Sequence, residues 1–425
     1  MVRNKLSIFS LVLVYIYAFL IVYNPGFFTN EYLNYALPFG YWLIGLLFLN
    51  TNPNKLVIKI FNNRYINSYI IFGLLAILFF VFRALFARVS FSDLTHLRIV
   101  QSLSVLFSLL SFYYLERYLD HHSFTAIDKT QLLLNVCLIQ FVFVLIMVLS
   151  PQFRMAVLER FYLKPNVNYS FTIAKRVYGL MSNYTFAGSV FHGIMAFMAL
   201  YLGSFANRKF FAYVPVILLI VFLNSRIGLI VFIVATVFYF LYNLIFKNTL
   251  NRTLRITLIV SLILLVAFSL LPVIWPNTFN FFVNGFLDLF NYAATGVASN
   301  ERISDIDLLA NQLKTDFNYQ TLLLGNGYRI QNSGDIPAGL IFKGLYSDIG
   351  FLNDMYMGGI IYMSLLYYPF IEMLIKTSFK DVELKWIFLV VAFLSNFKGE
   401  VFRAPIIIGT IIYLTISFDL KRSNE

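Results

Sequence analysis

Long apolar runs, separated by short polar connections, fill most of this chain. A helix that crosses a membrane needs about 20 mainly apolar residues, and about twelve runs approach or reach that length. The pattern therefore predicts an all-α fold, a polytopic integral membrane bundle of about 12 transmembrane helices. The predicted spans are 6–23, 35–50, 68–86, 99–115, 131–149, 184–203, 210–223, 227–246, 254–271, 350–372, 384–397 and 402–418.

Two polar segments interrupt this pattern. Residues 150–183 form a connection rich in lysine and arginine, and residues 272–346 form a much longer one. Within the longer segment, Asn300 and Glu301 suit a helix start, and Ile303, Ile306, Ala310 and Leu313 follow at helical spacing. We expect a single membrane domain over 1–425, which carries a basic loop at 150–183 and a large, partly helical loop at 272–346.

Composition agrees with a membrane protein. The 425 residues are 60% hydrophobic and only 12% charged, whereas soluble domains have about 25% charged residues. The net charge of +12 is dispersed among the spans, so nucleic-acid binding is not expected. The lone Cys137 excludes a disulfide within one chain and a cysteine metal site. The apolar run Leu6–Tyr23 lacks a small-residue cleavage site after it, which favours an uncleaved first helix.

Lysine and arginine in short loops indicate the orientation. The connections 51–67, 204–209 and 247–255 are basic, whereas 24–34 has no basic residue. Cytoplasmic loops are the basic ones, so both termini are expected in the cytoplasm and both long loops outside. The outer side is then richer in arginine than in lysine. Arginine presents a planar fork that matches phosphate oxygens, so a polyanionic ligand is expected there; pairing with lipid headgroups or with Asp93 is the alternative.

A short glycine motif lies in the large loop. Gly325 and Gly327 bracket Asn326, and Arg329 follows. Such a turn can aim backbone N–H groups and an arginine at a phosphate, although an ordinary turn gives the same pattern.

Four stretches together resemble the O-antigen polymerase and O-antigen ligase family of membrane glycosyltransferases. They occur in the family's order over roughly residues 170 to 370, while the first third of the chain matches only as generic spans. The first is the run Arg176, Gly179, Asn183 and Gly188. The others are Ser225-Arg226-Ile227-Gly228, Arg302 followed by Gly325-Asn326-Gly327, and Ser347-Asp348-Ile349-Gly350 followed by Gly358-Gly359.

The resemblance implies a metal-independent, GT-C-like glycosyltransferase of the bacterial inner membrane without a cofactor. Such polymerases act in lipopolysaccharide and surface polysaccharide biosynthesis at the periplasmic face. They transfer the growing glycan from undecaprenyl pyrophosphate to the next lipid-linked repeat unit. The expected partners are that lipid-linked oligosaccharide, membrane lipid and a chain-length regulator protein. O-antigen ligase, or a flippase of the same lipid-linked sugars, is the alternative.

Departure of a pyrophosphate needs stabilisation of negative charge, so we expect Arg176, Arg226, Arg302 and Arg329 to bind it. Asp348 is the candidate base for the acceptor hydroxyl, with a helix cap as the alternative role. Ligases of the family commonly carry a histidine near this point, and its absence favours a polymerase. The intramembrane His192, for which a helix-to-helix hydrogen bond is expected, and the acids Asp354, Glu372 and Glu400 are further candidates.

Overall fold

The structure is a computed structural model that describes most of the apolar part of the chain. The described residues are 6–28, 31–48, 66–86, 93–161, 177, 179–181, 186–247, 319–325, 349–379 and 381–419, with scattered single positions and pairs between 262 and 294. All structural statements below concern these residues.

Every regular element in the described ranges is helical, and one isolated β-bridge joins Phe379 to Asp419. The expected all-α class is confirmed for this part of the chain. The longer helices are α1 (Ile8–Tyr23), α2 (Glu31–Phe48), α4 (Ile66–Phe86), α5 (Asp93–His121), α6 (Ala126–Leu149), α7 (Pro151–Phe161), α9 (Ala187–Phe205), α10 (Tyr213–Asn224), α11 (Arg226–Phe246), α16 (Gly350–Lys376), α17 (Val382–Asn396) and α18 (Pro405–Ser417). The short ones are η1 (Arg208–Ala212), α15 (Tyr319–Leu324) and η3 (Val401–Arg403).

Local sequence explains several helix ends. Helix α6 begins with a capping box in which Thr125 and Asp128 each bond the other's backbone N–H. Helix α18 begins at Pro405, whose fixed φ suits a first helical position. Helix α1 ends where Asn24 adopts a left-handed conformation just before Pro25, which cannot continue the helix.

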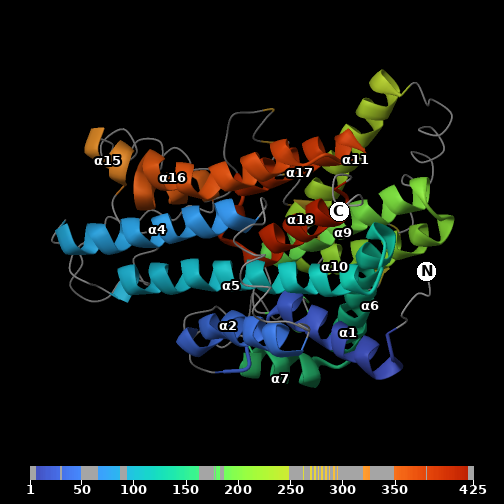
Figure 1. The fold of residues 1–425 in the computed structure, drawn as a ribbon. Coiled ribbons are helices and arrows are strands. Elements are labelled where there is room, and N and C mark those ends of the chain that lie inside the picture. The colour runs from blue at the N-terminus through green and yellow to red at the C-terminus, as the bar shows by residue number, and fades with distance from the viewer. Residues whose placement is uncertain are drawn as a thin grey trace.

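The centre of the molecule is formed by α9 and α18. All residues from Ala187 to Gly203 of α9 are buried, as are all from Ile406 to Ile416 of α18. A helix that is apolar on every side needs neighbours on every side. Figure 1 shows these helices between an upper layer of α16 and α17 and a lower layer of α1, α2 and α7, with α4 and α5 running between the layers.

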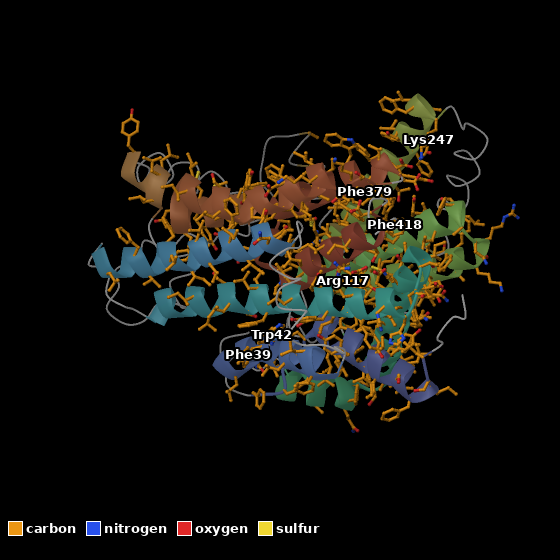
Figure 2. All side chains as sticks on the ribbon, in the orientation of Figure 1. Phe39, Trp42, Arg117, Lys247, Phe379 and Phe418 are labelled. Atoms are coloured by element: carbon orange, nitrogen blue, oxygen red, sulfur yellow. The ribbon has the colours of Figure 1, made fainter. Side chains whose placement is uncertain are left out.

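The outer helices expose an apolar stripe. On α4 the exposed large side chains recur at helical spacing, and they are Ile71, Leu74, Leu75, Leu78, Phe82 and Leu85. In water such a stripe would be unfavourable, whereas in a bilayer it contacts lipid. Figure 2 shows the side chains of the described residues as sticks on the helices of the bundle. Four described helices, α6, α9, α11 and α16, are long and apolar enough to cross a membrane by length and composition. The chain is therefore compatible with a multi-pass membrane protein.

Helix α16 departs from the single span predicted at 350–372. Inside it, Gly359 has φ 64° and ψ −165°, a conformation that is essentially restricted to glycine. In a straight helix, Phe351 and Tyr367 would stand about 24 Å apart, whereas their ring centroids are 5.8 Å apart. The two limbs of α16 therefore fold back side by side as a helical hairpin. The apolar pattern could not reveal the reversal, because both limbs are apolar.

Two turns and the start of α9 meet at one end of the bundle, which we call the Ser225 end. The Ser189 hydroxyl of α9 donates to the carbonyl of Ser225, between α10 and α11, at 2.7 Å. A Cβ on Gly399, in the α17–α18 turn, would lie 2.5 Å from the ring of Phe186. The start of α16 reaches the same place, because a Cβ on Gly350 would lie 2.3 Å from the Gly399 carbonyl oxygen.

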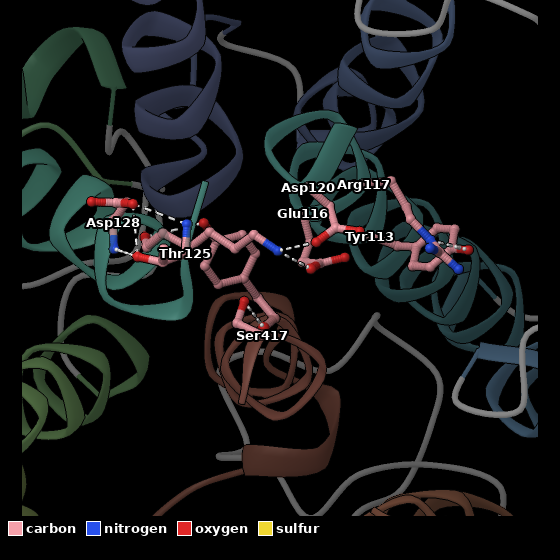
Figure 3. Close-up of polar contacts among 9 residues, drawn as sticks. Tyr113, Glu116, Arg117, Asp120, Thr125, Asp128 and Ser417 are labelled. Carbon is pink, nitrogen blue, oxygen red and sulfur yellow. Dashed lines mark hydrogen bonds and ion pairs between the residues drawn. The ribbon is translucent and has the colours of Figure 1, made fainter. Parts of the chain in front are cut away.

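Ion pairs hold the opposite end, which we call the Lys129 end. The Lys129 Nζ lies 2.6 Å from Glu116 Oε1 and 2.9 Å from Asp120 Oδ1, and Figure 3 shows both acids on α5. The Tyr413 hydroxyl of α18 donates to the Lys129 carbonyl. Another ion pair joins Lys247 Nζ, at the end of α11, to Glu383 Oε1 of α17 at 2.5 Å.

Candidate functional site

Most of the sequence-predicted site residues lie outside the described part of the chain. These are Arg176, Arg302, Arg329 and Asp348, and most of the loops 150–183 and 272–346 lie outside it as well. Arg226 is described. Its predicted role and those of the other four residues stay predictions.

Arg226 is the first residue of α11 and is half-buried at the Ser225 end. The turn that presents it is held by α9: the Gly228 N–H donates to Ser189 Oγ at 3.2 Å, and Ser189 in turn donates to Ser225. A Cβ on Gly228 would lie 2.2 Å from the Ser189 carbonyl oxygen. The serine, arginine and glycine spacing noted in the sequence thus produces a tight, rigid turn that fixes the backbone of Arg226.

The chain just after Arg176 approaches the same turn. The Val177 N–H donates to the carbonyl of Leu223, one residue before the last residue of α10, at 2.9 Å. Gly179 has φ 66°, and a Cβ on it would lie 2.4 Å from the amide nitrogen of Gln140. Only glycine suits both the conformation and the close approach.

Gly325 has a packing role. It has φ 65°, and a Cβ on it would lie 2.4 Å from the backbone nitrogen of Gly358. Reciprocally, a Cβ on Gly359 would lie 2.3 Å from the carbonyl of Leu323. Figure 1 shows α15 against the end of α16. Gly325 therefore closes α15 onto the tip of the α16 hairpin, while Gly327 lies outside the described residues.

A largely buried charged cluster, Asp354–Arg403–Glu400, lies at the Ser225 end. Arg403 Nε is 2.9 Å from Asp354 Oδ1, and Arg403 Nη2 is 2.7 Å from Glu400 Oε1. The third guanidinium nitrogen, Nη1, approaches Met357 Sδ at 3.7 Å. Tyr367 donates to the other oxygen of Asp354 at 2.6 Å, and Asn396 donates to Tyr367 at 3.0 Å.

The charge state of Arg403 follows from these neighbours. A guanidinium keeps its proton in proteins, and the carboxylates of Asp354 and Glu400 lie within ion-pair distance of two of its nitrogens. Arg403 is therefore a permanent cation between two carboxylates. Sequence reasoning singled out Asp354 and Glu400 but did not pair them with Arg403, although an arginine three residues after a glutamate between two apolar runs was a usable signal.

The cluster borders a cavity of about 50 Å³ between α4, α5 and α16. Its lining is mainly apolar: Tyr69, Gly73, Ala76, Ser102, Val105, Leu106, Leu109, Tyr362, Leu365, Leu366, Pro369, Phe402 and Arg403. The Tyr69 hydroxyl is buried and has no hydrogen-bond partner among the residues that the structure describes. A buried hydroxyl without a partner is costly, so it is available to a ligand in the cavity.

The other intramembrane candidates have structural partners. His192 lies within hydrogen-bond distance of Tyr23 on α1, at 3.0 Å, and of the Gly188 carbonyl, at 2.7 Å. The expected helix-to-helix hydrogen bond of His192 is thus confirmed. Glu372 forms an ion pair with Lys376 one turn further along α16. Within the described ranges, no group of three or more His, Cys, Asp and Glu residues is arranged to hold a metal ion.

Comparison with known proteins adds no further constraint. No protein-family model, no curated protein and no solved structure matches this chain.

Proposed function

We propose that this protein is a membrane glycosyltransferase that polymerises surface polysaccharide from lipid-linked repeat units. The growing glycan leaves undecaprenyl pyrophosphate and joins a hydroxyl of the next unit. In this proposal arginines, rather than a metal ion, stabilise the departing pyrophosphate.

One observation carries the proposal: a mainly apolar cavity lies inside the bundle, and its lining includes the Tyr69 hydroxyl as a polar group. A lipid pyrophosphate has the same division, a long apolar chain and a compact polar head. The apolar walls from α4, α5 and α16 suit part of the isoprenoid chain, and the Tyr69 hydroxyl suits a polar group at its head.

The cations of this proposal come from the Ser225 end. Arg226 is fixed there by the α10–α11 turn, and the Val177 hydrogen bond brings the segment that follows Arg176 to the same turn. Arg302 and Arg329 are proposed to complete the pyrophosphate site from the large loop. Arg403 is not assigned to phosphate, because its three nitrogens already face Asp354, Glu400 and Met357.

The finer topology belongs to the same proposal. It comprises twelve spans with a GT-C-like arrangement in the bacterial inner membrane, both termini in the cytoplasm and the Ser225 end at the periplasm. The short helices support a recessed site. Helices α17 and α18 have 15 and 13 residues, or about 20 Å of length, against a hydrocarbon core of about 30 Å. The turn between them would therefore lie below the membrane surface.

The test is polymerisation by the purified full chain in proteoliposomes, with undecaprenyl-pyrophosphate oligosaccharide as the only sugar source. We expect a ladder of longer glycans on a gel and release of undecaprenyl pyrophosphate. Arg226→Lys should lower the rate about tenfold or more, because a point charge cannot copy the guanidinium fork. The exposed Arg208 of η1, at the Lys129 end, supplies the matched control Arg208→Lys, which should keep the wild-type rate.

Transport of the lipid without any new glycosidic bond would refute the polymerase proposal in favour of a flippase. Transfer only to a lipopolysaccharide core acceptor would refute it in favour of a ligase. The cavity is tested separately: Ala76→Leu should raise the KM for the lipid-linked donor, and an unchanged KM would remove the isoprenoid chain from this cavity.

A further inference from the structure

We propose that Glu400 is the base that accepts the proton of the acceptor hydroxyl, with Arg403 and Asp354 as its positioning residues. This inference rests on the proposed function and adds a residue role to it. The role was assigned from the sequence to Asp348, which lies outside the described residues.

The backbone of Glu400 is fixed. The side-chain oxygen of Asn396, at the end of α17, accepts the Val401 N–H at 3.0 Å, and Gly399 packs on Phe186. The Arg403 N–H donates to the carbonyl of Glu400 itself at 3.3 Å. A base must be held within hydrogen-bond reach of the proton that it removes, so a rigid turn is a suitable support.

The side chain of Glu400 is held from one side by Arg403, whose Nη2 lies 2.7 Å from Glu400 Oε1. Arg403 is held in turn by Asp354 on α16, and both oxygens of Asp354 are engaged, one by Arg403 and one by Tyr367. In this arrangement Asp354 orients Arg403, and Arg403 orients Glu400.

Exposure distinguishes the three members. The side chain of Asp354 is 0% exposed and that of Arg403 is 8% exposed, whereas that of Glu400 is 20% exposed. A sugar hydroxyl can reach only the last of these. The sum of the three charges is −1, and uptake of a proton by Glu400 makes it zero.

The turn that carries Glu400 and the turn that carries Arg226 both contact the start of α9. The turn of Glu400 packs on Phe186 through Gly399, and the turn of Arg226 is bonded to Ser189. Phe186 and Ser189 are three residues apart, which is about 4.5 Å along α9. The first turn of α9 therefore supports both the turn of the proposed base and the turn of the proposed leaving-group cation.

The step balances without a further reactant. The acceptor O–H bond breaks and its proton goes to Glu400, while the oxygen forms a bond to the anomeric carbon. The bond from that carbon to the pyrophosphate oxygen breaks, and its electron pair leaves with undecaprenyl pyrophosphate. Glu400 then returns the proton to water.

The experiment uses the full chain in proteoliposomes with the lipid-linked oligosaccharide. We expect Glu400→Gln to lower kcat by about 10²- to 10⁴-fold, the usual contribution of a general base, with KM changed only a few-fold. Formate added to Glu400→Ala should restore part of the rate, which a purely structural role would not allow. Glu400→Asp keeps the charge beside Arg403 and so preserves the fold, yet it should lose about tenfold or more because its carboxylate is displaced. The matched control is Glu372→Gln, an acid of α16 that is paired with Lys376 and has no role in the proposed step.

A wild-type kcat in Glu400→Gln would overturn the assignment, as would a loss that lies wholly in KM. The assignment would also be overturned if formate restored the rate of Asp348→Ala but not that of Glu400→Ala. Failure of the proposed function looks different, because the wild-type protein itself would then release no undecaprenyl pyrophosphate.

Discussion

The ion pairs at the Lys129 end allow a quantitative prediction about stability. Lys129 contacts two acids with very different surroundings: the Glu116 side chain is 0% exposed, whereas that of Asp120 is 44% exposed. The lysine side chain itself is 4% exposed. The perturbation is removal of the cation by Lys129→Met, whose unbranched side chain is one atom shorter than that of lysine.

The expected magnitude follows from burial. Removal of one partner of a buried ion pair costs about 3–5 kcal/mol, because the other charge stays buried without compensation. Lys129→Met should therefore lower the free energy of unfolding by about 3–5 kcal/mol through Glu116. Asp120 is solvated, so Asp120→Asn should cost no more than about 1 kcal/mol. Removal of both buried charges in Lys129→Met with Glu116→Leu should recover most of the loss, since well-packed apolar residues can replace a buried pair.

The assay is reversible unfolding by sodium dodecyl sulfate in mixed micelles, with all variants in the same lipid and detergent. The reasoning would be refuted if Asp120→Asn cost as much as Lys129→Met. It would also be refuted if the double variant were less stable than Lys129→Met alone, because the loss would then not arise from an isolated Glu116 carboxylate.

Two glycine substitutions test the packing, each against Gly40→Ala, where an added Cβ meets no atom of the described residues within 4 Å. Gly359→Ala should lower the free energy of unfolding by about 1–3 kcal/mol because of its φ of 64°, and by more because the added Cβ would collide with Leu323. A loss equal to that of Gly40→Ala in the same unfolding assay would contradict the hairpin in α16. Gly193→Ala should lower the free energy of unfolding by about 1–3 kcal/mol, because its Cβ would lie 2.3 Å from the Gly228 carbonyl oxygen where α9 crosses α11. An unchanged free energy of unfolding would mean that the helices do not cross so closely.

The candidate site could be predicted from the sequence only in part. The turn at Asn224, Ser225 and Arg226 could be predicted because it is local: two apolar runs meet there with three polar residues between them. The pairing of Asp354 with Arg403 could not, because the two residues are 49 positions apart in the chain. Apolar periodicity reports which face of a helix is buried but not which neighbour buries it.

The sequence by itself determined the helical fold class of this protein and its compatibility with a lipid bilayer. Apolar runs of membrane length and few charges leave a helical membrane bundle as the consistent fold, because backbone groups in lipid must bond within their own segment. Only the tertiary structure decided that α16 reverses at Gly359, and that Glu400, Arg403 and Asp354 form one cluster beside a cavity. This reversal uses one residue with positive φ, Gly359, and the cluster depends on contacts between distant segments. Neither changes the hydrophobic pattern, so neither can be inferred from it.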